Sequence, residues 1–284
     1  MLVSRSFKFN SRFSYNAQSI IDPQGRLWRK SDFLYQLVSE INGTPVPSLR
    51  SVVNNSVFIT RYGELIRITE RKVEEIRTPG PVKLALPIHD RSIDILLENG
   101  DYYRDIVGDY TLHSRGVTVM WRSGTTTMLI NDRNHLINTS SGQVTDSLNV
   151  TSRITAVDGN TILLNERTLI RLHPIFMSVN EELVHHASIM KDIRTGTIQY
   201  PIMILTSDSW LYFYDQELNS LRNVQRICPE IDNYCVVELL SRTTLHEDAL
   251  VCFIVSTGEV CSIRQIDGRY RVVKSDIPVE CVSV

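Results

Sequence analysis

Arginine recurs at one position of a repeated sequence pattern, and it is the residue type of this chain best suited to a charged binding surface. Four repeats carry it four residues after their turn residue: Arg29, Arg67, Arg104 and Arg171. A guanidinium presents several donors in a fixed plane and binds carboxylates and phosphates with paired hydrogen bonds. If the repeats form a ring, equivalent positions lie on a circle, and we expect a partial positive ring that binds a partner. The alternative is that these arginines face solvent or contact the next repeat and pair with nearby acids, as surface arginines commonly do.

Other residue types that support chemistry show no ordered spacing. His185 and His186 are adjacent, so they point to opposite faces of an extended chain, and no H-E-x-x-H pattern occurs. The G-x-S-x-G, G-x-x-x-x-G-K and G-x-G-x-x-G motifs are also absent. The sequence therefore predicts no metal site, no cofactor and no catalytic residue, and it favours a non-enzymatic protein.

Two functional alternatives stay open, one for the aromatic residues and one for the charged residues of the inner strands. The aromatic residues of the predicted hairpins, among them Trp28 and Trp210, could stack on sugars as in a lectin, although they are one register apart and core packing explains them better. Charged residues of the predicted innermost strands could form an enzyme site facing a central channel: Lys83, Arg122, Asp158 and Glu238. These four share no column of the repeat, and this leaves the enzyme as the second alternative.

Composition narrows the class of protein. The 284 residues are 42% apolar, enough for a large core, and the formal net charge of −2 disfavours a surface made for nucleic acid. No segment is long and apolar enough to span a bilayer, and residues 1 to 8 lack the apolar run of a secretory signal. Five cysteines are an odd number without C-x-x-C spacing, which is typical of reduced core residues. We expect an intracellular, cytoplasmic protein rather than a secreted one.

The elements that position these residues are seven hairpins. In each, two apolar residues precede a short polar turn, whose register is set on Gly25, Gly63, Gly100, Arg133, Arg167, Asp208 and Gly258. Adjacent apolar residues point to opposite faces of a strand, so these strands are predicted to be buried on both faces. The turns recur roughly 33 to 50 residues apart, a period that suits a four-stranded blade and not a lone hairpin.

Flanking apolar runs predict an inner strand before most hairpins and an outer strand after them. The pattern predicts an all-β fold: a seven-bladed β-propeller of four-stranded antiparallel blades, forming a single domain over residues 1 to 284. Residues 279 to 284 are a further strand-like run with no eighth hairpin after it. We expect this strand to join the first blade and close the ring, since closure would cover an open sheet edge.

The kernel Arg61-Tyr62-Gly63-Glu64-Leu65-Ile66 resembles the aliphatic-aliphatic-x-x-Gly-x-Leu pattern of many propellers. The chain as a whole is similar to the generic seven-bladed class that includes WD40 proteins and proteins with repeats like those of the regulator of chromosome condensation. It lacks the Trp-Asp and Gly-His dipeptides of WD40 blades, so no family's functional residues are carried over.

Such a ring is typical of a scaffold whose faces and loops bind other proteins. The sequence therefore favours a protein–protein interaction module, including a subunit of a larger cellular or viral assembly. A lectin-like or peptide-binding propeller is the first alternative. The longest inserts are the predicted recognition loops, at residues 223 to 233 and 242 to 248.

Overall fold

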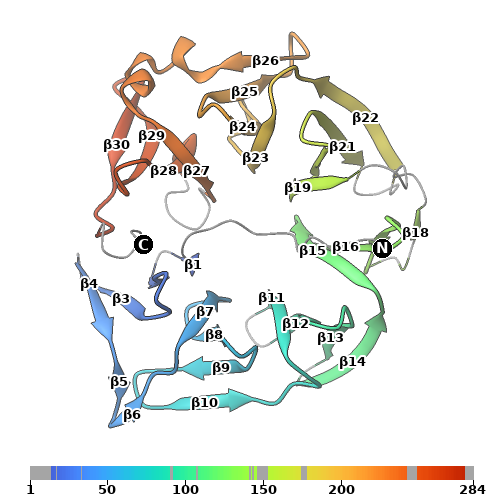
Figure 1. The fold of residues 1–284 in the computed structure, drawn as a ribbon, viewed down its shortest axis with the longest axis vertical. Helices are drawn as coiled ribbons and strands as arrows, with labels where there is room; N and C mark the ends of the chain where they lie inside the picture. The colour runs from blue at the N-terminus through green and yellow to red at the C-terminus, as the bar shows by residue number, and fades with distance from the viewer. Residues whose placement is uncertain are drawn as a thin grey trace.

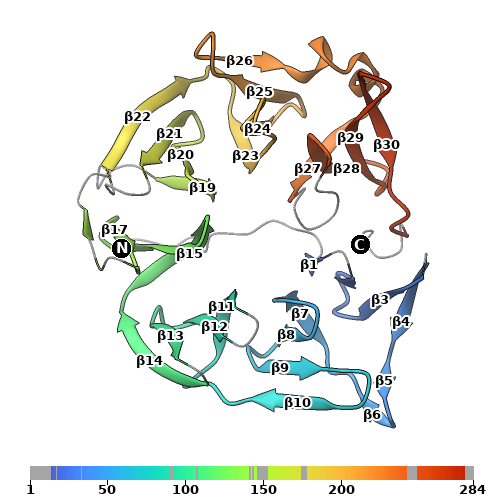
Figure 2. The same ribbon diagram turned by 180° about the vertical axis from the view of Figure 1, so that it is seen from behind.

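The computed structural model is a ring of seven four-stranded antiparallel sheets (Figures 1 and 2), as the sequence predicts. The structure describes residues 14–16, 18–32, 34–89, 92–106, 108–140, 142, 144–145, 153–173, 178–241 and 248–278. No helix among these residues is long and apolar enough to cross a membrane.

The first four blades follow the order of the chain, each from its innermost to its outermost strand. Blade 1 is β1 (Ser14–Tyr15), β2 (Ser19–Ile21), β3 (Leu27–Ser31) and β4 (Leu34–Val38), and the small hairpin of β5 (Glu40–Ile41) and β6 (Thr44–Pro45) follows it. Blade 2 is β7 (Leu49–Val52), β8 (Val57–Thr60), β9 (Leu65–Ile68) and β10 (Val73–Ile76). Blade 3 is β11 (Val82–His89), β12 (Ser92–Leu97), β13 (Tyr102–Ile106) and β14 (Asp109–Ser114). Blade 4 is β15 (Val117–Ser123), β16 (Thr126–Asn131), β17 (Leu136–Asn138) and β18 (Val144–Thr145).

The remaining three blades repeat the same order. Blade 5 is β19 (Ile154–Asp158), β20 (Thr161–Leu164), β21 (Thr168–His173) and β22 (Ser178–His185). Blade 6 is β23 (Met190–Thr195), β24 (Ile202–Thr206), β25 (Leu211–Asp215) and β26 (Ser220–Asn223), followed by two 3-10 turns, η1 (Val224–Arg226) and η2 (Pro229–Asn233). Blade 7 is β27 (Val236–Leu240), β28 (Val251–Val255), β29 (Val260–Ile266) and β30 (Arg269–Lys274).

The second strand of each blade is the core of the ring. Every residue of β2, β8, β20, β24 and β28 is buried, because each sheet is packed between two neighbouring sheets. This confirms the doubly buried strand that the paired apolar residues predict. Burying one such aliphatic or aromatic side chain contributes about 1.5–3 kcal/mol to folding.

The turns after the second strands of blades 1, 2 and 3 also join consecutive blades. Gly25 adopts a φ of +83°, and its carbonyl accepts a 2.8 Å hydrogen bond from the Leu49 N–H of the next blade. Gly63 and Gly100 accept the same bond from Val82 and Val117, at 2.7 and 2.9 Å. The next blade packs directly on these turns, so a glycine is required by its positive φ and by the lack of room for a side chain.

Two turn positions of the sequence register are corrected by one residue. The residues equivalent to Gly63 are Asn134 and Ser209, which have φ of +59° and +68° and make the same turn hydrogen bond, and not Arg133 and Asp208. The sequence register is set on the apolar pairs Met128-Leu129 and Met203-Ile204, but the buried apolar runs of these two strands extend one residue further, to Ile130 and Leu205.

Because successive strands are antiparallel, the turns of a blade lie at two ends of the ring. The turn between second and third strands, such as that of Gly25, lies at one end, which we name the Gly25 end. The turns before the second strand and after the third lie at the other, which we name the Ile198 end after the loop between β23 and β24.

Blades 7 and 1 close the ring through side chains. Ile20 and Tyr35 of blade 1 share a buried cluster with Leu240, Ile254 and other residues of blade 7. The Tyr15 hydroxyl accepts a 2.6 Å hydrogen bond from the Ser241 N–H. The strand at residues 279 to 284 lies outside the described residues, and its role in closure stays a prediction; within the described part, β1 pairs with β2.

Candidate interaction surface

The arginine column lies on the third strands of four blades, and three of its members contact the following blade. Arg29 Nη2 donates a 2.7 Å hydrogen bond to the Ile68 carbonyl of blade 2, and its guanidinium lies 5.9 Å from the ring centre of Phe58. Burial lowers the pKa of Arg29 from its usual value, and Glu70 partly offsets this. Arg29 therefore contributes to the contact between blades 1 and 2.

Two further arginines contact the next blade in a similar way. Arg104 Nη1 donates to the Thr139 carbonyl of blade 4 at 3.4 Å, and the Arg171 guanidinium lies 5.9 Å from the Tyr214 ring centre of blade 6. Arg67 is exposed. Burial raises the pKa of Tyr110 in blade 3 to about 12, and the charge of Arg67 offsets part of this rise. The structure thus favours blade-to-blade contact for Arg29, Arg104 and Arg171, and partner binding by the column stays a prediction.

The innermost strands carry charged residues in shared columns that sequence comparison missed. Six inner strands have a bulge near their start, for example between Met190 and Asp192 and between Val236 and Glu238. The bulge lies at the same place in each of these strands, directly after the residue that pairs with the end of the second strand, so the strands share one register. In this register Asp192 aligns with Glu238, and Asp158 aligns with Arg194.

These inner-strand charges interact with one another. Arg194 Nη1 lies 2.7 Å from Oδ1 of Asp192, and the Thr195 N–H donates a 2.5 Å hydrogen bond to Asp158 Oδ2. Burial raises the pKa of Asp192 to about 6, Arg194 lowers it and the charge of Asp158 raises it further. Arg194 is the central cation of the group, since Asp192, Asp158, Tyr15 and Glu238 all raise its pKa against the effect of burial.

The other two residues considered for a channel-face enzyme donate hydrogen bonds within the ring. Lys83 Nζ donates to the Thr118 carbonyl at 3.5 Å, and Arg122 Nη1 donates to Thr127 Oγ1 at 3.3 Å. Among the residues that the structure describes, no three His, Cys, Asp or Glu side chains gather where they could hold a metal ion.

The aromatic residues of the lectin alternative do not form a repeated site. Trp28 Nε1 donates a 2.9 Å hydrogen bond to the buried carboxylate of Asp22, which Arg26 also contacts at 2.6 Å. Trp210 is exposed in the turn that precedes β25, so it is not equivalent to Trp28.

A buried aspartate that sequence reasoning missed links blades 3 and 4. Asp94 lies on the second strand of blade 3, accepts a 2.6 Å hydrogen bond from the Tyr102 hydroxyl and lies 3.4 Å from Thr127 Oγ1 of blade 4. Burial raises the pKa of Tyr102 above its usual value, and Asp94 raises it further. The sequence does contain a sign of this buried aspartate, since Asp94 lies between Ile93 and Ile95 in an otherwise apolar strand.

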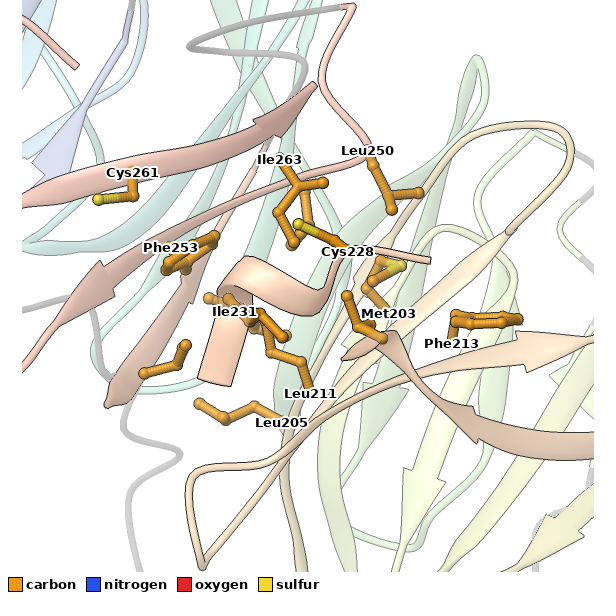
Figure 3. Close-up of a cluster of buried hydrophobic side chains, with 14 of the residues drawn as sticks. Met203, Leu205, Leu211, Phe213, Cys228, Ile231, Leu250, Phe253, Cys261 and Ile263 are labelled. Atoms are coloured by element: carbon orange, nitrogen blue, oxygen red, sulfur yellow. The ribbon is translucent and has the colours of Figure 1, made fainter. Parts of the chain in front are cut away.

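The first predicted recognition loop, residues 223 to 233, contains η1 and η2. Val224, Cys228 and Ile231 from this insert are buried in a cluster between blades 6 and 7, and Figure 3 shows Cys228 and Ile231 among side chains of both blades. The apolar side of the insert therefore belongs to the core. The second predicted loop, residues 242 to 248, lies outside the described residues except for Asp248.

Blades 6 and 7 instead present apolar residues at the Ile198 end. Ile198, in the loop between β23 and β24, is 99% exposed, and Ile266, at the end of β29, is 41% exposed. Tyr200 lies between these regions, with its ring centre 4.6 Å from that of Phe213 and 6.1 Å from that of Tyr270. We name Ile198, Tyr200, Ile266 and Tyr270 the tip surface.

The loop that carries Ile198 has a defined shape. Gly196 N–H donates to the Pro201 carbonyl at 2.9 Å, and Tyr200 N–H donates to Thr197 Oγ1 at 3.2 Å. A Cβ on Gly196 would come within 2.0 Å of the Tyr200 carbonyl oxygen, so only glycine fits there. The loop therefore presents Ile198 to solvent on a backbone that is held by two hydrogen bonds within the loop.

Comparison with known proteins identifies the fold. No protein-family model and no curated protein matches the sequence. Among solved structures, the chain is similar to PorZ, a bacterial surface component of the type-IX secretion system of Porphyromonas gingivalis, with a TM-score of 0.57 and 11% identity over 94% of this chain. This chain spans 38% of the length of PorZ.

Two further structures resemble the chain over most of both lengths. The computationally designed Ika8 protein has a TM-score of 0.58 and 11% identity, covering 95% of this chain and 86% of its own. A streptogramin B lyase has a TM-score of 0.53 and 10% identity, covering 88% of each chain. A secretion component, a designed protein and a lyase resemble this chain, so the similarity shows the β-propeller fold and leaves function to the surface of this chain.

Proposed function

We propose that this protein is a non-enzymatic protein–protein interaction module, in which the ring is a rigid support and the tip surface of blades 6 and 7 binds a partner protein. The observation that carries this proposal is the full exposure of Ile198 on a loop held by Tyr200. An aliphatic side chain in water does not stabilise the isolated protein, and together with Ile266, Tyr200 and Tyr270 at the same end of blades 6 and 7 it offers apolar surface that a partner protein can cover.

The ring suits this role because several of its charged residues are used in contacts within the ring. The arginines of blades 1, 3 and 5 contact the following blade, and the inner-strand acids surround Arg194. These contacts support a framework that keeps its shape when a partner docks. The free cysteines among the described residues, Cys228, Cys235, Cys252 and Cys261, support a reducing, intracellular location for the interaction.

The proposal is tested by affinity capture from the native source with quantitative mass spectrometry. The wild type is compared with Ile198→Asp and with the control Ile106→Asp, which changes a 61% exposed residue at the same end of blade 3. We expect a defined set of proteins to be retained by the wild type and the control and lost with Ile198→Asp. Equal capture by all three proteins would contradict the tip surface as the docking site.

A further inference from the structure

The outer strand of blade 1 differs from the other outer strands in charge. In both views of the ring β4 lies at the periphery, and β3 is its only strand partner within the described part of the chain. Among outer strands of four or more described residues, β4 alone contains no Asp, Glu, Lys, Arg or His. Charged side chains on an edge strand oppose pairing with another chain, and β4 lacks that protection.

The side chains of β4 are also unusual for an exposed edge. Leu34 at its start is 69% exposed and Leu37 is 46% exposed, whereas Tyr35 between them turns into the core shared with blade 7. Leu34 and Val38 lie on the same face of the strand, since side chains alternate with a period of two. The strand thus has a protruding leucine at its first residue and a half-buried valine on the same face at its last.

A small cavity opens beside that last residue. It has a volume of about 250 Å³ and is lined by Leu37, Val38 and Ser39, by the turn at residues 24 to 27, and by residues 46 to 48. Pockets for small organic ligands usually measure about 300–1,000 Å³. This cavity is smaller, and a single aliphatic side chain suits it better.

We propose that β4 pairs with β4 of a second copy of this chain, antiparallel and about a two-fold axis through Gln36, and joins the two first blades into one eight-stranded sheet. This register places Leu34 of each copy opposite Val38 of the other. Directly opposite residues in an antiparallel pair lie on the same face, so each Leu34 side chain is brought to the cavity of its partner.

The strand is complementary to itself, and this favours a second copy over another partner. A two-fold contact uses the same patch on both copies, so a protrusion at one end must meet a hollow at the other, as Leu34 and the cavity do. In the same arrangement β30 would bring together its own Arg269, Arg271 and Lys274, and like charges that face one another are destabilising. The inference uses a surface separate from the tip surface, so the two proposals can fail independently.

Sedimentation velocity of the full chain over a range of concentrations tests the association. The contact is one short strand pair and two leucines, below the size of a standard stable interface, so we expect a reversible dimer with a dissociation constant on the order of micromolar. Leu34→Lys should abolish the dimer at concentrations where the wild type is largely dimeric. The control Ile106→Lys, which changes an exposed residue of blade 3, should leave the dimer unchanged.

Cysteine cross-linking tests the register, in a background where the exposed Cys235 is replaced by Ser. On the proposed axis the two residues at position 36 are directly opposite, within the range that a disulfide can join. Gln36→Cys should therefore yield a covalent dimer under mild oxidation. Leu34→Cys should not, because the two positions are separated by four residues of strand, about 13 Å.

Either experiment can overturn the proposal. A wild type that stays monomeric at all concentrations would exclude the dimer, as would a dimer that Leu34→Lys does not affect. Cross-linking of Leu34→Cys with none of Gln36→Cys would exclude the register. If the protein is monomeric and the amides of β4 become protected from hydrogen exchange only when a different protein binds, β4 belongs to that partner instead.

Discussion

The Tyr102 hydroxyl donates a 2.6 Å hydrogen bond to Oδ2 of Asp94, and both side chains are buried where blade 3 meets blade 4. Thr127 of blade 4 lies 3.4 Å from the same oxygen, so the carboxylate joins two blades through polar contacts inside an apolar ring. A buried carboxylate is tolerated only when hydrogen bonds replace the water that it has lost.

Removing this donor should destabilise the ring. Tyr102→Phe leaves Asp94 buried with one partner fewer, and we expect the free energy of unfolding to fall by about 1–3 kcal/mol. Urea unfolding followed by tryptophan fluorescence measures the change. Tyr62→Phe is the control, since Tyr62 is 83% exposed and its hydroxyl should contribute nothing measurable.

The turn glycines allow a test of the contact between blades. Gly25 and Gly43 both have positive φ, but a Cβ on Gly25 would lie 2.7 Å from the Leu49 carbonyl oxygen, whereas a Cβ on Gly43 would meet nothing within 4 Å. Both alanine variants incur the backbone cost of about 1–2 kcal/mol. Gly25→Ala should lower the free energy of unfolding by a further 1–3 kcal/mol or so, because the next blade must move away. Equal losses in the two variants would show that the next blade does not pack closely on this turn.

Asp192 should make stability depend on pH. Its pKa in the folded protein is raised to about 6, chiefly by burial, from an ordinary value of 3.8. Between these two pH values the folded protein keeps a proton that the unfolded chain has released, so the free energy of unfolding falls as the pH rises through this window.

Asp192→Asn removes this titration. Denaturant unfolding at several pH values should show that the difference in stability, wild type minus variant, declines from about pH 4 to 6 and is level above that. A difference that rises over the same window would mean that the carboxylate is stabilised by Arg194 more than burial disfavours it.

The arginine column should divide into structural and exposed members. Arg29→Ala loses a hydrogen bond to the Ile68 carbonyl and the contact with Phe58, and we expect a loss of about 1–2 kcal/mol in the free energy of unfolding. Arg67→Ala should stay within about 0.5 kcal/mol of the wild type, because Arg67 is exposed. Thermal unfolding of both variants checks this. If charge reversal at both positions also leaves the captured proteins unchanged, the column has no role in partner binding.

The apolar insert between blades 6 and 7 should behave as core. Ile231 is buried with Phe253 and Leu211 from both blades (Figure 3), so Ile231→Ala should leave a cavity and cost about 2–5 kcal/mol. Proteolysis at the seam between blades 6 and 7 should increase at the same time. If Ile231→Ala hardly changes the free energy of unfolding, residues 223 to 233 are not part of the core and remain a candidate recognition loop.

Much of the architecture could be predicted from the sequence because its signals are local. Two adjacent apolar residues before a polar turn, as in Ile20-Ile21 and Phe58-Ile59, are enough to specify a strand buried on both faces and its hairpin. Seven such hairpins specify seven blades. The arginine column was also visible, since equivalent positions of a repeat have the same offset from the turn.

The sequence by itself therefore predicted a ring of seven blades and the equivalence of Arg29, Arg67, Arg104 and Arg171, and the structure confirmed the number of blades. Only the tertiary structure decided where those arginines are directed, because the contact of one blade with the next depends on how the sheets are packed. The loops between first and second strands differ in length, as the one after β23 and the one after β27 do, so spacing measured from the turns concealed the alignment of Asp192 with Glu238. The tip surface joins Tyr200 to Tyr270 across seventy residues of chain, and nothing in either segment alone specifies that they meet.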